Sequence, residues 1–519
     1  MTQQSNRFNQ KIGGFVLSYL SQFVYLLSSL FFLPFILKIL GQNEYGLYQF
    51  SASIISNLSL LSLGLNSAYI KFYSKFKSQN DEQSLKKLNG LYLHIFIFIA
   101  FISLVCSFII IENLDMFFND KLTSSELNKS KKLMLILAFC LSMSFVNNVF
   151  QAIVLSKERF VWSKVMELLS VLLNPSISFP LLLLGYQSYS LAIASCVATL
   201  IVFIFNFFYI IFKLNTKFIF FSFDLKLLKE LLIFSFFIFL NIIVEQISWN
   251  IDNILLAKFC GVTEVAIYSI GGQIVHIFRV LNGSIRTLFI PEFNKLVSES
   301  QNINVIENKF IDVSRKIYFV CIFMFGGYCL FGEQIIIYWI GEKYKLSYYC
   351  ALILLASLVV PIIQGPGIDI QRAMNKHMAR SVAYTVIAMA NVLISIILIY
   401  HIGILGAPLG TAIALISGHW IFMNYYYNYH LSINIKKYWF SIINTVPLLL
   451  MYNFVFYLLI YYFKTKSIFG LIVEICIYSI LYFAIVFFFC LNKTEKDLFF
   501  RLFCKKIFKN DFSINDNQV

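Results

Sequence analysis

About fourteen stretches of roughly twenty apolar residues follow one another along this chain, separated by short polar segments. Each is long enough to cross the ~30 Å hydrocarbon core of a bilayer as an α-helix, which satisfies its own backbone hydrogen bonds. A hydrophobic content of 59% lies outside the range of soluble domains. The sequence therefore predicts an all-α integral membrane protein with about fourteen transmembrane helices, near 12–37, 45–68, 90–111, 132–155, 165–185, 189–212, 231–257, 264–288, 316–340, 348–366, 381–400, 404–427, 440–463 and 468–491.

A short motif in this series occurs twice. The segment LGQNEYGLY at 40–48 returns as CGVTEVAIY at 260–268, an offset of 220 (260 − 40), with the glycine, the glutamate and the last tyrosine in register. A weaker echo relates the stretch 151–159 to the stretch 371–380. Many secondary transporters are built from duplicated halves, with the substrate site between them. The repeat therefore favours a transport function.

The repeat also predicts the domain organisation. Each half holds six spans, an even number, so both halves enter the membrane in the same direction and form a parallel repeat. We expect two six-helix lobes around a central cavity, followed by two extra C-terminal helices. The expected boundaries are an N-lobe at 1–212 (spans 1–6), an inner linker at 213–230, a C-lobe at 231–430 (spans 7–12), spans 13–14 at 431–491 and a basic cytoplasmic tail at 492–519.

The formal net charge of +15 does not indicate nucleic-acid binding, because of where the charge lies. With the N-terminus inside, Lys and Arg favour the inner segments over the outer ones by roughly three to one. The basic segments near 71–87 and 493–509 are therefore interpreted as orientation signals that lie against anionic lipid headgroups. Both termini are expected in the cytoplasm.

Cofactor chemistry and nucleotide hydrolysis find no support in the sequence. The chain has no GxxxxGK[ST] phosphate-binding motif, and no loop is large enough to fold as a separate domain. Its ten cysteines include no CxxC pair and fall almost entirely within apolar spans, as small packing residues do. We expect no cofactor and no metal site.

Two consecutive spans carry polar residues at helical spacing. Within 231–257 these are Asn241, Glu245, Ser248 and Asp252, and within 264–288 they are Gln273, His276, Arg279, Gly283 and Arg286. Each set lies on one face of its helix. A turn near 260–262 would bring Glu245 and Arg279 to similar depth, facing each other or a shared aqueous cavity.

This arrangement has two interpretations. In the first, Glu245 and Arg279 form a permanent ion pair that makes two charges tolerable in the bilayer. In the second, Arg279 and Arg286, with His276, bind an anionic ligand, while Glu245 or Asp252 takes up a proton or cation. The first half offers mainly amides, of which Asn57 and Asn147 are substrate-binding candidates for a hydroxyl-rich ligand; interhelical hydrogen bonding is the alternative.

Several short motifs resemble a known family. Residues 13–76 resemble the start of bacterial polysaccharide flippases, often called Wzx-type, through Pro34, the LG…EYGLY segment at 40–48 and LGL at 63–65. The second half is similar around DNILL at 252–256, Gly261…Glu264…Tyr268, Pro291 and the stretch 371–380. These flippases belong to the multidrug/oligosaccharidyl-lipid/polysaccharide exporter superfamily.

The resemblance implies a flippase that carries undecaprenyl-diphosphate-linked oligosaccharide repeat units from the inner to the outer leaflet by alternating access. It implies a role in surface polysaccharide (O-antigen or capsule) assembly in the bacterial cytoplasmic (inner) membrane, with Arg279 and Arg286 meeting the diphosphate or acidic sugars. No covalent bond changes, so no enzyme is expected. The implied partners are the lipid-linked oligosaccharide, membrane lipids, H⁺ or Na⁺, and a polysaccharide polymerase with its chain-length regulator; nucleic acid is not among them.

Three other functions stay open at this point: a multidrug exporter, a membrane glycosyltransferase, polymerase or ligase, and a non-transporting scaffold of similar fold, against which the buried charges argue. A cation-coupled multidrug exporter of the same fold would want a more acidic cavity than one that includes two arginines. A membrane polysaccharide polymerase would typically need a sizeable outer loop with catalytic groups, whereas the longest outer loop here, about 112–131, has no evident acid/base pair.

Overall fold

The structure, a computed structural model, describes residues 2–220, 224–299, 302–374, 376, 378–463, 467–492 and 495–496. Within these ranges the side chains of 2–9, 11, 237, 240, 241, 245, 247–249 and 463 lie outside the described part. The described residues form helices joined by short turns and contain no β-strand. The all-α prediction is confirmed.

Helices long enough to span a bilayer account for most of the molecule. Ten stretches of the described residues are long and apolar enough to cross a membrane. Two of them, Ile12–Ser78 and Met378–His430, each contain two of the spans expected from the sequence. Helices at Leu225–Phe259 and Val262–Thr287 coincide with the expected spans 231–257 and 264–288. Helical elements therefore cover every expected span.

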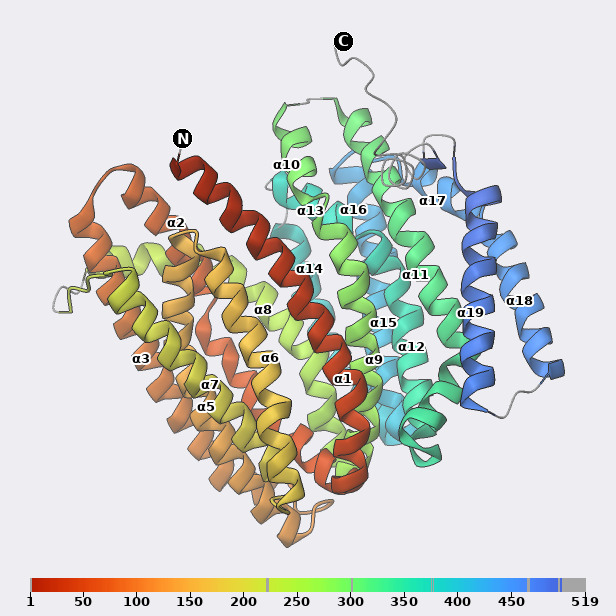
Figure 1. Ribbon diagram of the computed structural model, residues 1–519, viewed down its shortest axis with the longest axis horizontal. Helices are drawn as coiled ribbons and strands as arrows, with labels where there is room; N and C mark the ends of the chain where they lie inside the picture. The colour runs from red at the N-terminus through yellow and green to blue at the C-terminus, as the bar shows by residue number, and fades with distance from the viewer. Residues whose placement is uncertain are drawn as a thin grey trace.

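The first half of the chain forms one group of helices, on the left of Figure 1. Helix α1 runs along this group and packs against α6, and α5 packs against both α3 and α7. Thr123 starts α5 with a capping box, in which it bonds reciprocally with Glu126. The elements are α1 (Thr2–Asn57), η1 (Leu58–Ser62), α2 (Leu65–Ser78), α3 (Glu82–Glu112), α4 (Leu114–Phe118), α5 (Ser124–Ser156), α6 (Phe160–Leu183), α7 (Tyr189–Phe208) and η2 (Tyr209–Lys213).

The second half from α9 onward forms the group on the right of Figure 1, whereas α8 is labelled on the left, among the helices of the first half. Helix α8 joins the two groups because it packs on both α1 and α14, and α19 packs on the flank of α11. The elements are α8 (Leu225–Phe259), α9 (Val262–Thr287), α10 (Ile290–Glu299), α11 (Ile303–Ile340), η3 (Glu342–Tyr344), α12 (Lys345–Ile363), α13 (Gly365–Ala373), α14 (Met378–Ile402), η4 (Gly403–Leu405), α15 (Gly406–Leu415), η5 (Ile416–Phe422), α16 (Met423–His430), α17 (Ile435–Ile443), α18 (Val446–Phe463), α19 (Ile468–Ile485) and η6 (Val486–Cys490).

The repeated motif performs the same structural task in both halves. Gly41, with φ of 75°, kinks α1, and Gly261, with φ of 103°, separates α8 from α9. Both angles lie in a region that favours glycine, because a Cβ there would be strained. Each copy is therefore a helix–glycine–helix corner, as its position between two apolar spans predicts.

The two corners contact each other. A Cβ built on Gly46 would lie 1.9 Å from the carbonyl oxygen of Val262, so only glycine permits this approach of the two backbones. Asn253 adds a hydrogen bond across the halves, donating from Nδ2 to Ser53 Oγ over 2.8 Å. The duplicated motif thus holds the halves together at one end of the molecule.

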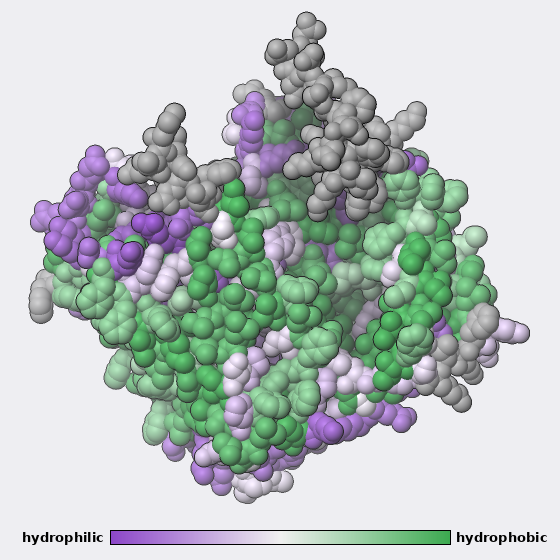
Figure 2. Space-filling view, in the orientation of Figure 1, coloured by the Kyte–Doolittle hydropathy of each residue, from purple (hydrophilic) through white to green (hydrophobic). Residues whose placement is uncertain are grey.

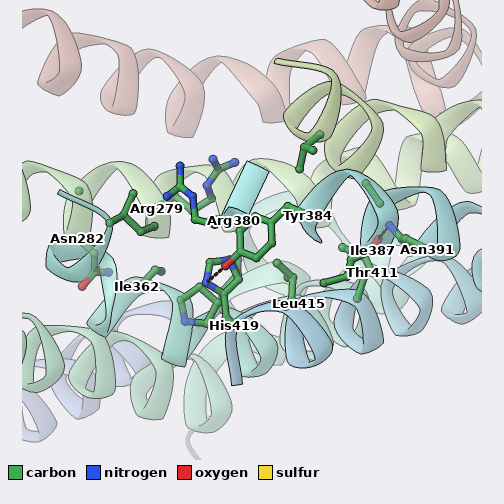
Figure 3. A pocket seen from close by; sticks show the side chains of 18 of the residues that line it. Arg279, Asn282, Ile362, Arg380, Tyr384, Ile387, Asn391, Thr411, Leu415 and His419 are labelled. Carbon is green, nitrogen blue, oxygen red and sulfur yellow. Dashed lines mark hydrogen bonds between the residues drawn. The ribbon is translucent and has the colours of Figure 1, made fainter. Parts of the chain in front are cut away.

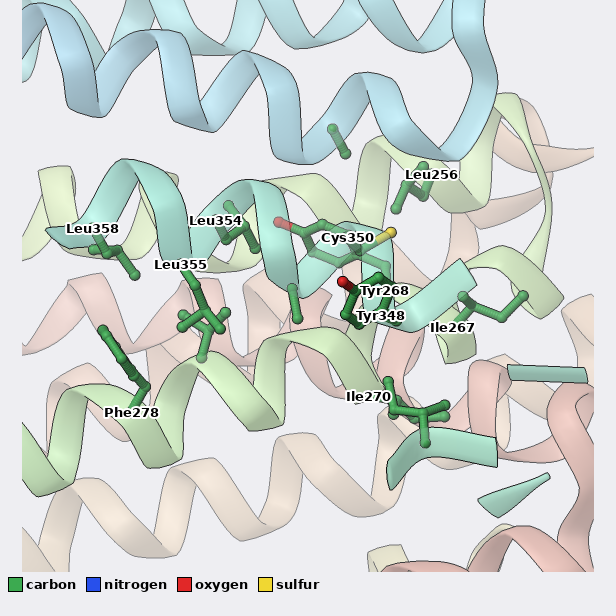
Figure 4. Close-up of a cluster of buried hydrophobic side chains, with 14 of the residues drawn as sticks. Leu256, Ile267, Tyr268, Ile270, Phe278, Tyr348, Cys350, Leu354, Leu355 and Leu358 are labelled. Carbon is green, nitrogen blue, oxygen red and sulfur yellow. The ribbon is translucent and has the colours of Figure 1, made fainter. Parts of the chain in front are cut away.

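The distribution of hydrophobic side chains on the surface and in the core fits a membrane environment. Figure 2 shows a broad hydrophobic band across the middle of the visible face, with hydrophilic side chains gathered at its two ends. Exposed leucines, isoleucines and phenylalanines are numerous, as a lipid-facing surface requires. Between α9 and α12 a cluster of buried side chains fills the interior, including Tyr268, Leu354 and Leu355 (Figure 4). Ser347 Oγ donates to the carbonyl of Ile267 over 2.8 Å and so joins the two helices.

The part of the expected linker 213–230 that the structure describes lies against α3 and α5. Asn89 Nδ2 donates to the carbonyl of Lys217 over 3.1 Å, and Lys157 Nζ donates to Thr216 Oγ1 over 2.7 Å. Asp224 then caps the start of α8. Residues 221–223 lie outside the described range, as does most of the expected basic tail at 492–519.

Candidate functional site

A pocket of about 740 Å³ lies within the second group of helices. All of its lining residues fall between Val244 and His419, on α8, α9, α12, α13, α14, α15 and η5. Figure 3 shows it from close by, with Arg279 and Arg380 among the side chains on its wall. The pocket was expected between the two lobes, but none of the described residues of the first half lines it.

Basic side chains dominate the polar part of the wall. Four arginines and two histidines line it, namely Arg279, Arg286, Arg372, Arg380, His276 and His419. No aspartate or glutamate is among the described lining residues. The pocket therefore suits an anionic ligand.

Arg286 stands at the end of α9 and is already paired. Its Nε and Nη2 donate to the two carboxylate oxygens of Asp369 on α13, each over 2.7 Å. Asp369 is 4% exposed. A Cβ on Gly365 would lie 2.9 Å from Arg286 Cδ, so the small residue at the start of α13 leaves room for the arginine. This bidentate pair holds α13 against α9.

Arg380 stands in the first turn of α14, beside two rings. Its guanidinium lies 5.9 Å from the centre of the Tyr384 ring. The Tyr384 hydroxyl lies 3.0 Å from His419 Nδ1 (Figure 3, dashed line). Arg380 is only 6% exposed, and its Nε has no hydrogen-bond partner among the described residues.

Asp252 is fully buried behind the pocket wall and belongs to a chain of polar groups. Its Oδ2 accepts hydrogen bonds from Tyr268 Oη (2.5 Å) and Thr411 Oγ1 (2.9 Å). Asn391 Nδ2 donates to Thr411 Oγ1 over 3.4 Å, and Ser395 Oγ donates to Asn391 Oδ1 over 3.1 Å. Because Asn391 and Thr411 line the pocket, this chain connects the carboxylate to the pocket. Asp252 Oδ1 has no partner in the described part of the chain.

Most other residues of the same two spans line the pocket or have side chains outside the described part, whereas Gln273 bonds with Ser29 and Tyr45 of α1. Arg279 and His276 line the pocket, and the His276 ring packs edge-to-face against Tyr25 of α1 at 5.5 Å. The side chain of Glu245 lies outside the described residues, so its pairing with Arg279 stays a prediction.

The two asparagines from the first half lie away from this pocket. Asn57 Nδ2 donates to the carbonyl of Ser53 over 2.8 Å, within the last turn of α1. Asn147 Oδ1 accepts from Asn206 over 2.9 Å, and Asn206 in turn accepts from Trp162 Nε1. Both amides make local or interhelical hydrogen bonds, which was the alternative that the sequence left open.

Sequence reasoning missed several residues of the pocket wall. Arg372, Tyr384, Asn391, Thr411 and His419 line the pocket but were not singled out, and Arg380 was noted only as part of a repeated inner stretch. Asp369, the partner of Arg286, was missed as well. The signal lay in that stretch, since Gln371–Arg380 is rich in charge and flanks an apolar span. Nothing in its spacing showed that a short helix, α13, folds it back against α9.

Comparisons with known proteins agree with this architecture. A family model described as "polysaccharide biosynthesis protein" matches residues 36–348. No curated protein matches the chain. The solved structure of the lipid II flippase MurJ in an inward closed conformation is 17% identical, with a TM-score of 0.72, and the match covers 95% of this chain and 100% of that one.

Two further solved structures share the fold. An inward-facing multidrug resistance MATE family transporter of the MOP superfamily is 15% identical, with a TM-score of 0.61, and the match covers 77% of this chain and 96% of that one. A mutant of the Vibrio cholerae MATE transporter VcmN is 13% identical, with a TM-score of 0.56, and the match covers 84% of this chain and 100% of that one. The chain belongs to the polysaccharide biosynthesis protein family and adopts the fold shared by MurJ and the MATE transporters.

Proposed function

We propose that this protein is a flippase that moves undecaprenyl-diphosphate-linked oligosaccharide repeat units from the inner to the outer leaflet of the bacterial cytoplasmic membrane. It works by alternating access and supplies O-antigen or capsule assembly. The observation that carries the proposal is the arginine-lined pocket of about 740 Å³ within the second group of helices of a MurJ-like fold, in a member of a polysaccharide biosynthesis family.

The task explains the composition of the pocket. A diphosphate-linked sugar cannot cross ~30 Å of hydrocarbon without losing its hydration. Guanidinium groups replace the water around the phosphates or acidic sugars, and the amides and hydroxyls of Asn282, Asn391 and Thr411 replace the water around sugar hydroxyls. The polyprenyl chain stays in the lipid.

Asp252, with Glu245, is the proposed ion-coupling element. A carboxylate buried in a membrane protein favours loss of its charge or capture of a cation. Asp252 has one oxygen without a partner among the described residues, and hydroxyl and amide oxygens stand nearby on Tyr268, Thr411 and Asn391. Uptake of H⁺ or Na⁺ at this position would change the bonds between α8, α9 and α15, and so bias the two access states.

A multidrug exporter of the same fold is the second candidate, supported by the MATE likeness. An exporter of cationic drugs needs an acidic cavity, whereas the described wall of this pocket is basic. The experiment below also distinguishes a polymerase function of this chain from contacts that this chain makes with a separate polymerase and its chain-length regulator.

The experiment is deletion of the gene followed by analysis of surface polysaccharide and of the lipid-linked intermediates on each leaflet. The proposal predicts loss of the surface polymer, with single repeat units accumulating on the inner leaflet. Normal polysaccharide with increased sensitivity to cationic drugs would instead indicate the exporter. Unpolymerised repeat units on the outer leaflet would indicate a polymerase. Purified protein in vesicles then tests directly whether the lipid-linked oligosaccharide changes leaflet.

A further inference from the structure

The end of the pocket near α13 holds an excess of positive charge. Arg286, Arg372 and Arg380, here called the arginine cluster, all line this pocket, from the last turn of α9, the last turn of α13 and the first turn of α14. Asp369 is the acid bound to this cluster, and Arg286 takes both of its oxygens. Three guanidinium groups and one carboxylate leave a formal charge of +2 among the described residues at this end.

Among the three arginines of the cluster, Arg380 is the one whose burial and missing hydrogen-bond partner among the described residues indicate a ligand. It is 6% exposed, its Nε is buried without a partner in the described part of the chain, and its guanidinium lies beside the ring of Tyr384. A guanidinium taken out of water without a paired carboxylate is destabilising because it loses hydration, and an aromatic ring beside it offsets only part of that loss. Two like charges nearby increase that cost.

The local fold adds further positive potential at the same place. Helix α14 begins at Met378, so Arg380 lies in the first turn, where backbone N–H groups have no helical acceptor and the helix dipole is positive. Tyr384, one turn later, is held by the hydrogen-bond contact with His419, and Gly418 leaves room for its ring, since a Cβ there would lie 3.2 Å from Tyr384 Cε1. The rings wall one side of the guanidinium.

This end is separate from the deeper part of the pocket. Along α9, Arg286 and Arg279 are seven residues apart, which corresponds to an axial separation of about 10 Å. Along α14, Asn391 lies eleven residues after Arg380, an axial separation of about 16 Å, and both Asn391 and Thr411 line the pocket. A ligand that places an anion at the arginine cluster would extend its hydroxyl-rich part toward these groups.

We propose that Arg380, assisted by Arg372, forms an oxyanion-binding site at the α13 end of the pocket, and that Arg286 is not free for this role because Asp369 occupies it. The ligand is an oxyanion on the transported headgroup, either a phosphate of the polyprenyl diphosphate or the carboxylate of an acidic sugar. This inference rests on the proposed flippase function and assigns a binding role within it.

The test measures binding to the purified full chain in phosphatidylcholine nanodiscs, with two probes. Undecaprenyl diphosphate carries the phosphates without sugar, and a soluble hexuronic-acid oligosaccharide carries carboxylates without lipid. Arg380→Gln should raise the Kd for one or both probes at least about tenfold, because a charge-assisted bidentate interaction is lost. A loss of affinity confined to undecaprenyl diphosphate identifies the diphosphate as the ligand. A loss of affinity confined to the hexuronic-acid oligosaccharide identifies an acidic sugar.

Arg159→Gln is the matched control. Arg159 corresponds to Arg380 in the weaker sequence repeat, lies at the start of α6 and does not line the pocket. Its removal should leave both affinities unchanged. Arg380→Lys keeps the charge and the fold but cannot bind in a fork, so it should show an intermediate loss. If Arg380→Gln does not fold, Arg380→Lys decides the question. An Arg380→Lys protein that binds both probes with wild-type affinity would overturn the proposal.

The inference and the proposed function can fail separately. If the wild type moves lipid-linked oligosaccharide between leaflets and the Arg380 variants bind both probes as Arg159→Gln does, the oxyanion site is wrong and the flippase function stands. If the wild type moves no such lipid but binds an anionic probe through Arg380, the site stands and the function is wrong. A wild type that binds neither probe overturns the site.

Discussion

At the scale of single residues, equivalent positions of the two halves carry side chains of different chemistry. The repeat places Tyr48 opposite Tyr268, but Asp252 corresponds to Phe32 in the first half. Tyr268 uses its hydroxyl to bind the Asp252 carboxylate over 2.5 Å. Equivalent positions therefore support packing in one half and a buried polar network in the other.

Asp252→Asn tests the ion-coupling role of that network. Asparagine keeps an oxygen that can accept from Tyr268 and Thr411, so the fold should survive while the titratable charge is lost. We expect transport by proteoliposomes to lose its response to an imposed H⁺ or Na⁺ gradient. Glu333→Gln is the control, because Glu333 pairs with Lys345 at the surface. Gradient-dependent transport equal to that of the wild type would contradict the assignment.

At the scale of elements, two ion pairs hold short helices and appended helices in place. Arg286 binds Asp369 and joins α9 to α13. Arg315 of α11 binds Glu495, which follows η6 in the chain, with Nε to Oε1 at 3.0 Å, and also donates to the carbonyl of Cys490 at 3.0 Å. Both pairs connect segments that neither apolar spans nor helical periodicity would have brought together.

Asp369→Asn should loosen α13. The substitution leaves Arg286, which is about a quarter exposed, without a counter-charge and should lower the free energy of unfolding by about 2–4 kcal/mol. Thermal unfolding of the purified protein measures this, and Arg286→Gln added to Asp369→Asn should recover part of the loss. If the free energy of unfolding of the double variant fell by more than the sum of the decreases in the two single variants, that would argue against direct pairing.

Glu495→Gln should weaken the attachment of the last helices. Both partners of the pair are less than a tenth exposed, so the unpaired Arg315 costs about 3 kcal/mol, seen as a lower unfolding temperature. Glu299→Gln removes an exposed partner of Lys295 and serves as the control, with no measurable change expected. Equal unfolding temperatures for the two variants would show that the buried pair contributes nothing.

At the scale of the whole molecule, the two halves meet through the duplicated corner and through polar bonds between α1 and its neighbours. Gly46 allows the Val262 carbonyl to approach, and Ser29 Oγ donates to Gln273 Oε1 over 3.2 Å. At the other end of α1, Tyr19 Oη donates to the carbonyl of Ser284 over 3.1 Å. Any rocking of one half against the other must break or slide these contacts.

Gly46→Ala tests the contact between the halves. The added methyl would lie 1.9 Å from the Val262 carbonyl oxygen, so the two backbones must separate, at a cost of about 1–3 kcal/mol. We expect a lower unfolding temperature and slower transport. Gly272→Ala, where no heavy atom lies within 4 Å of the new Cβ, should have neither effect. Identical behaviour of the two variants would refute the close approach.

The sequence by itself determined the membrane class, the positions of the spans and the duplicated corners. Apolar length and glycine conformation are local properties, so Gly41 and Gly261 could be recognised without any knowledge of packing. Helical spacing placed His276, Arg279 and Arg286 on one face of their helix, because residues three and four apart share a face, and the structure puts that face on the pocket wall.

Only the tertiary structure decided which charged side chains have a bonding partner and which residues complete the pocket. Asp369 and Arg286 are 83 residues apart, and Asp252 and Thr411 are 159 apart, so no spacing rule connects them. The same holds for Asn147, whose Oδ1 accepts from Asn206, 59 residues further along the chain. Periodicity shows which way a side chain faces along its own helix, whereas its partner depends on how distant helices pack, and that packing is a property of the whole fold.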